Sequence, residues 1–62
     1  MNDRQIKAVY YIKENKIINL SSYKDLIKDV SEKTLYRDLQ DLVAKNLLKE
    51  IGDKKGWKYE LT

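Results

Sequence analysis

The spacing of the apolar residues changes once along this chain, close to Leu47, and this change limits what the chain can fold into. Upstream, apolar side chains recur every three or four residues, which is the period of a helix with one buried side. Downstream, from Trp57 to Leu61, they alternate with charged side chains, which is the period of a strand. The pattern therefore predicts helices first and β-structure at the end.

Two helices are predicted in the first half of the chain. The first covers residues 2–15, because Asn2 is a favoured N-cap and Gln5 lies three residues later, where it can complete a capping box. A short β-prone segment follows at 17–18. The second helix covers residues 20–27 and has one apolar side.

The third helix is predicted to start after Ser31, a strong N-cap, and to end at Asn46, a residue type that tolerates the left-handed conformation of a helix end. A tight turn at 28–30, with Asp29 at its centre, separates it from the second helix. Its buried side consists of Leu35, Leu39 and Leu42.

The last third of the chain reads as a β-hairpin. Residues 48–51 and 57–61 form the strands, and the loop at 52–56 has a glycine at each end. Trp57 is predicted to cover the core, because the alternation places it on one side with Tyr59 and Leu61; a base-stacking role is the alternative.

Composition removes several classes of function. The chain has 62 residues, no Cys and no His, which excludes disulfides and ordinary zinc sites, so we expect no metal and no cofactor. The usual nucleophile and base partners are also missing, and we expect no enzyme. No signal peptide or membrane span is visible. We expect one domain, 1–62, either whole or part of a longer protein, in the cytoplasm.

The element order is that of a winged helix-turn-helix, a mainly α fold with a small β-hairpin: three helices and a two- or three-stranded wing. The net charge of +3 suits a nucleic-acid binder. We therefore predict binding to double-stranded DNA, with the third helix, about 31–45, in the major groove and the hairpin at 52–56 on the backbone or in the minor groove. The predicted DNA-contacting residues are Ser31, Lys33, Thr34, Tyr36, Arg37, Gln40, Lys54 and Lys55.

Each of these residue types has a chemical reason to meet DNA. Arginine can pair bidentately with guanine and glutamine with adenine, whereas hydroxyls and lysines hold phosphates. The alternative is a solvated charged face on which Arg37 pairs with Asp41 at i+4. Asp38 and Asp41 lie on the same helix and would weaken its attraction for phosphate.

A protein-binding function is the second hypothesis. Ile6 and Tyr10 widen the apolar stripe of the first helix beyond what one core contact requires. This face could form a homodimer or dock onto another domain of a parent protein.

The stretch 30–42, followed by 45–48, resembles the pattern V-S-x-x-T-x-x-R-D-L-x-x-L…K-G-L-L of DeoR-type bacterial repressors. It is also similar to the winged-helix module at the C-terminus of many Fic-family proteins, enzymes that transfer AMP to hydroxyl groups. The beginning of the chain and residues 56–61 look more like the Fic-associated module. The resemblance implies a bacterial transcription regulator or an accessory domain, with DNA-facing residues on the third helix and a wing around Lys54 and Lys55.

The chain departs from these families at two turn positions and in one motif. Asp29 and Asn46 stand where the families usually have glycine; both residue types can adopt positive φ. The Fic catalytic motif, with its histidine and glycine-rich anion loop, is absent, so the resemblance implies no AMP transfer by this chain.

Overall fold

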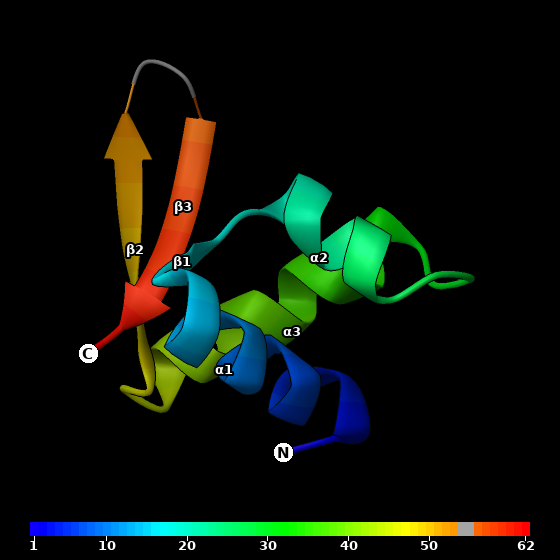
Figure 1. Cartoon of the computed structure of the whole chain (residues 1–62), viewed down its shortest axis with the longest axis horizontal. Coiled ribbons are helices and arrows are strands. Elements are labelled where there is room, and N and C mark those ends of the chain that lie inside the picture. The colour runs from blue at the N-terminus through cyan, green and yellow to red at the C-terminus, as the bar shows by residue number, and fades with distance from the viewer. Residues whose placement is uncertain (54–55) are drawn as a thin grey trace.

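A computed structural model describes residues 1–53 and 56–62. Over these ranges the chain forms three helices and three strands (Figure 1). In chain order they are α1 (Asp3–Asn15), β1 (Ile17–Ile18), α2 (Leu20–Leu26), α3 (Glu32–Ala44), β2 (Leu48–Asp53) and β3 (Gly56–Leu61). The predicted succession of helices followed by a hairpin is confirmed. None of the helices found in these ranges is long and apolar enough to cross a membrane.

The three helices begin at polar caps. The Asn2 side chain accepts a hydrogen bond from the Gln5 amide at 2.8 Å, and the Gln5 side chain accepts one from the Asn2 amide at 3.0 Å. These two bonds complete the predicted capping box. Asn19 caps α2 and Ser31 caps α3. Since a cap satisfies amides that the helix leaves without a partner, these residues set where each helix begins.

The segments that end the helices use non-glycine residues with positive φ. Asn46 has a φ of 62°, and the Leu47 amide donates to the Leu42 carbonyl at 3.0 Å, which closes α3 in a Schellman motif. Asp29 has a φ of 66° in the turn between α2 and α3. The expectation that both residues can adopt positive φ is confirmed. Lys16, with a φ of 78°, ends α1 in a way that the sequence did not predict.

The strands form one antiparallel sheet in the order β1-β3-β2. The prediction of a five-residue hairpin loop at 52–56 is wrong, because Gly52 pairs with Trp57 and Asp53 pairs with Gly56. Both glycines therefore belong to strands, and positions 54 and 55 lie outside the described residues.

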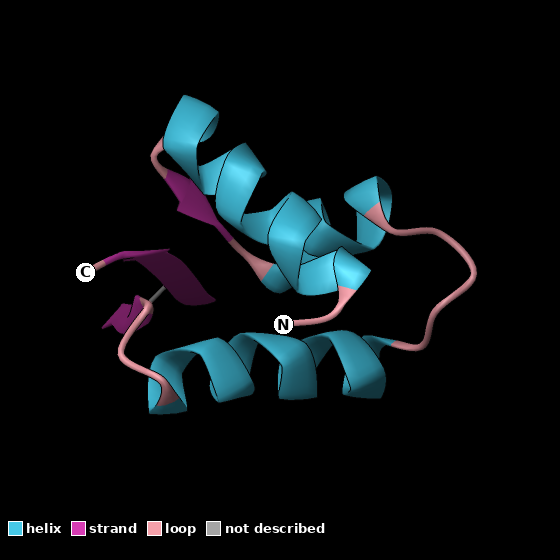
Figure 2. Ribbon diagram, turned by 90° about the horizontal axis from the view of Figure 1, so that it is seen from below, coloured by secondary structure: helices cyan, strands magenta, loops and turns pink. Residues whose placement is uncertain are grey.

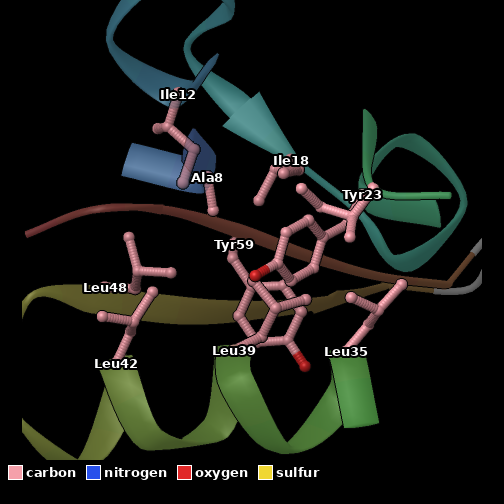
Figure 3. Close-up of a cluster of buried hydrophobic side chains, with 10 residues drawn as sticks. Ala8, Ile12, Ile18, Tyr23, Leu35, Leu39, Leu42, Leu48 and Tyr59 are labelled. Atoms are coloured by element: carbon pink, nitrogen blue, oxygen red, sulfur yellow. The ribbon is translucent and has the colours of Figure 1, made fainter. Parts of the chain in front are cut away.

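The core lies between the inner side of α3, the sheet and the other two helices (Figure 3). The three leucines predicted for the buried side of α3 are fully buried there. They pack with side chains from every other element. The remaining core residues are Ala8, Ile12, Ile18, Tyr23, Ile27, Leu48 and Tyr59.

The prediction that Trp57 covers this core is wrong, because its side chain is 62% exposed. Trp57 and Tyr59 do lie on the same side of β3, where Tyr59 is buried. The hairpin extends beyond the core, however, and Trp57 lies on that extension. Its ring rests on Gly52 of the paired strand, where an added Cβ would lie 2.2 Å from Trp57 Cζ3.

Candidate nucleic-acid interface

The outer side of α3 carries the candidate interface. Because the leucines point into the core, residues on the opposite side of the helix point to solvent. Lys33, Tyr36 and Arg37 are exposed there, while Thr34 is half-buried. Figure 2 shows α3 along one side of the molecule, with α1 and α2 together on its other side. No other described element covers this outer side.

Lys33 and Arg37 are the cations of this surface. Neither side chain makes an ion pair or a hydrogen bond within residues 1–53 and 56–62. Arg37 does not form the alternative ion pair with Asp41. Asp41 pairs instead with Lys45, at 2.9 Å between Oδ2 and Nζ. The two cations lie one turn apart and repel each other, so an anionic ligand would relieve that repulsion.

Asp38 does not contribute to this surface, contrary to expectation. Its side chain is only 9% exposed and points toward the other helices. The carboxylate accepts hydrogen bonds from Arg4 Nε at 2.7 Å, Asn2 Nδ2 at 3.2 Å and the Tyr23 hydroxyl at 3.2 Å. It therefore links α1, α2 and α3 at one point. Asp38 lies three residues after Leu35 and four before Leu42, a spacing that places it on the buried stripe.

The ionisation of Asp38 is maintained by its donors. Burial alone would raise the pKa of this carboxyl, but the hydrogen bonds from Arg4 and Asn2 outweigh burial and lower the pKa below its ordinary value. For Tyr23, burial and the nearby Asp38 charge both raise the pKa. The carboxylate is thus neutralised inside the protein, and its charge acts mainly on α1 and α2 rather than on the outer side of α3.

Asp41 also has partners within the protein. Its carboxylate accepts a hydrogen bond from Gln5 Nε2 at 2.9 Å in addition to the ion pair with Lys45. The Gln5 bond and then the Lys45 contact lower the pKa of Asp41. Both aspartates that were expected to weaken the field of α3 therefore have cationic partners. The remaining charged side chains on the first half of the helix are Lys33 and Arg37, which are positive, and Glu32, which is negative.

Gln40 holds α3 to the hairpin. Its Nε2 donates to Glu50 Oε2 at 2.6 Å and to the Tyr59 hydroxyl at 3.0 Å. Burial raises the pKa of Tyr59 to about 12, so this hydroxyl stays protonated at neutral pH. The predicted contact between Gln40 and a base requires the amide to exchange these partners, and it stays a prediction.

The start of α3 presents two hydroxyls. The Ser31 hydroxyl accepts from the Thr34 amide at 3.3 Å and donates to Thr34 Oγ1 at 3.1 Å. In the turn before it, Lys24 Nζ donates to the Val30 carbonyl oxygen, which ties this turn to α2. The hydroxyls, the first amides of the helix and Lys33 thus lie close together where a phosphate can be bound. The predicted contacts of Lys54 and Lys55 lie outside the described residues.

A second exposed surface lies on α1. Tyr10 is 63% exposed, Ile6 is partly exposed, and Lys13 Nζ lies 5.5 Å from the centre of the Tyr10 ring. An open pocket of about 310 Å³ adjoins Tyr10. Its lining consists of Lys7, Tyr10, Tyr11, Glu14, Asn15 and Leu26.

Together, the α2–turn–α3 pair, the helix packed behind it and the antiparallel sheet define a winged helix-turn-helix. No protein-family model and no curated protein matches the chain. Among solved structures it is similar to dissimilatory sulfite reductase D (DsrD), with a TM-score of 0.86 and 19% identity over 98% of this chain and 96% of that one.

The chain is also similar to MarR from E. coli. A cysteine-to-serine mutant of MarR matches with a TM-score of 0.83 and 26% identity, over 100% of this chain and 47% of MarR. The oxidised form of MarR matches with a TM-score of 0.82 and 24% identity, over 100% of this chain and 45% of that one. The chain thus spans nearly all of DsrD and less than half of MarR. These likenesses establish the winged-helix fold, and the resemblance to DeoR-type and Fic-associated modules stays a hypothesis.

Proposed function

We propose that this chain binds double-stranded DNA, with α3 in the major groove and the β2–β3 hairpin beside it on the backbone or in the minor groove. The observation that carries the proposal is the outer side of α3, where Lys33 and Arg37 have no partner within the described part of the chain. An exposed helix of 13 residues with cations near its N-terminal end suits a major groove about 12 Å wide.

The residues divide into two roles. Arg37, and Gln40 if its amide turns outward, can read base edges. Ser31, Lys33, Thr34 and Tyr36, with Lys54 and Lys55 of the hairpin, hold phosphates and set the position of the helix. The similarity to MarR and the DeoR-like stretch at 30–42 support a place in a bacterial transcription regulator of the cytoplasm. The likeness to Fic-associated modules supports an accessory domain of a longer protein as the alternative.

The test is a titration of mixed-sequence duplex across a series of salt concentrations. Each phosphate contact should contribute about −0.9 to the slope of log affinity against log salt. Arg37→Gln should reduce base preference, and Lys33→Gln should make the slope shallower by about 0.9. Lys16→Gln is the matched control, because it removes the same charge at the end of α1 and should leave the slope unchanged. A flat salt dependence of the unmodified protein would reject DNA binding.

A second candidate function, self-association through α1, is favoured by the charges around its exposed tyrosine. Lys7 and Glu14 lie at nearly equal distances along the helix on either side of Tyr10 and Tyr11. In an antiparallel pair of α1 helices related by a two-fold axis, Lys7 of one copy lies beside Glu14 of the other. The surface is therefore complementary to itself in charge and apolar at its centre.

Sedimentation tests this dimer. Tyr10→Lys should convert the dimer to a monomer, and Lys7→Glu alone should weaken it. The double variant Lys7→Glu, Glu14→Lys should restore association, because it exchanges the two charges across the interface. A protein that is monomeric at every concentration removes this second function and leaves DNA binding untouched.

A further inference from the structure

Trp57 is an indole ring left largely in water, although such a ring gains much from burial. The ring lies against the neighbouring strand. An added Cβ on Gly52 would lie 2.2, 2.7 and 2.9 Å from three atoms of its six-membered part. The ring therefore lies directly over the Gly52 backbone on the neighbouring strand. Only a residue without a side chain allows this close approach.

The ring lies on the sheet face that packs against α3. Paired residues in a sheet point to the same side, so Gly52 and Trp57 lie on the sheet face that carries Glu50 and Tyr59. Those two residues hold Gln40 of α3 through hydrogen bonds. Trp57 lies two residues farther toward the hairpin turn, about 7 Å along the strand. Since Arg37 precedes Gln40 by about one turn, this cation and the ring both lie near the place where α3 meets the hairpin.

We propose that Trp57 is a DNA-contacting residue and that its indole packs against the deoxyribose and base edges of the duplex whose major groove receives α3. This inference rests on the proposed function and adds an apolar contact to it. Gly52 is a positioning residue, since it lets the ring lie close to the strand with one face open. Binding would cover the exposed face of the ring, and such a contact releases no counterions.

The first experiment uses the protein's own fluorescence. Trp57 is the only tryptophan in the 62 residues, so selectively excited emission reports this site alone. Acrylamide quenching is measured with and without saturating duplex, while the anisotropy of a labelled duplex reports binding independently. We expect quenching to fall severalfold on binding. Saturated anisotropy with unchanged quenching overturns the role of Trp57 and leaves DNA binding intact, whereas no anisotropy change overturns both.

The second experiment separates an apolar contact from a phosphate contact. Trp57→Ala should lower duplex affinity roughly tenfold, as expected for uncovering part of an indole ring, without changing the salt slope. Lys33→Gln should change that slope. Gly52→Ala keeps the indole and displaces it, so we expect an intermediate loss. Leu47→Ala, at an exposed apolar position that precedes β2, is the control and should bind as the unmodified protein does.

One further variant and one further ligand complete the test. Trp57→Phe retains a ring and should recover part of the affinity that Trp57→Ala loses, because part of the apolar contact remains. A single-stranded oligonucleotide tests stacking on unpaired bases. Quenching protection by the single strand but not by the duplex would overturn the duplex contact, as would wild-type affinity in Trp57→Ala.

Discussion

Replacing Asp38 by alanine should destabilise the protein far more than replacing Asp41, although both carboxylates belong to α3. Asp38 is buried and accepts hydrogen bonds from α1 and α2, including one from the Tyr23 hydroxyl at 3.2 Å. Asp41 is exposed; it pairs with Lys45 at the end of the same helix and accepts one hydrogen bond from Gln5 of α1, whose Nε2 also donates to the Asp38 carbonyl oxygen. The comparison therefore separates a buried polar network from a surface contact at nearly the same position in the chain.

The magnitude follows from what the substitution leaves behind. The Tyr23 hydroxyl, whose residue is fully buried, loses its acceptor, which costs about 1–3 kcal/mol. The void left by the carboxylate adds to this, and we expect a total of about 2–3 kcal/mol. A chain of 62 residues has a free energy of unfolding of roughly 3–9 kcal/mol. Asp38→Ala should thus remove a large part of the stability and lower Tm by roughly 10–20 °C.

Thermal and urea unfolding followed by circular dichroism measure this difference. Asp41→Ala should cost no more than about 1 kcal/mol, because surface ion pairs contribute little and Gln5 Nε2 keeps its hydrogen bond to the Asp38 carbonyl oxygen. Asp38→Asn should lie between the two, since the amide oxygen can still accept from Tyr23 but carries no charge. Equal midpoints for Asp38→Ala and Asp41→Ala would refute the argument that this carboxylate links the three helices.

Three further predictions concern pH and the end of α3. Folding lowers the pKa of Asp38, so the stabilisation by this carboxylate is present above its ordinary pKa, near 4, and is lost as the pH falls through its pKa in the folded protein. On acidification, the urea midpoint should therefore fall more steeply in the unmodified protein than in Asp38→Asn. Burial raises the pKa of Tyr59 to about 12, so its stabilisation is present below about pH 10 and is lost toward pH 12; Tyr59→Phe should show a smaller alkaline loss, and an equal loss would contradict this. Asn46, with a φ of 62°, should tolerate glycine without loss, whereas Asn46→Ala should cost about 1 kcal/mol in thermal unfolding.

The helices and their limits could be predicted because their signals are local. Asn2 and Ser31 act on amides within three residues, and Asn46 acts at its own φ angle. The three leucines of α3 needed only the helical period. These interactions do not depend on where the rest of the chain lies, so a pattern of neighbours is enough to identify them.

The largest errors depend on where distant parts of the chain lie. Asp38 was expected to weaken the attraction of α3 for phosphate, whereas the partners that bury and neutralise it lie up to 36 residues away. The alternation along β3 identifies the side on which Trp57 lies, but not how far the helices extend beneath it. The hairpin loop was predicted too long because its glycines were interpreted as loop ends, whereas Gly52 provides space for a ring. The outward direction of Arg37 could be predicted, since it follows from the leucines alone.

The strand order has a consequence for how the molecule assembles. β3 is the last strand in the sequence and the central one in the sheet, with β1 on one edge and β2 on the other. During synthesis, Ile17 and Ile18 can pair with a neighbouring strand only after residues 59 and 60 have left the ribosome. The helices can associate earlier, because their contacts need only the first 44 residues. Closing the sheet should therefore be the late step of folding, and a ribosome-bound chain halted before Tyr59 should contain helix but no ordered sheet.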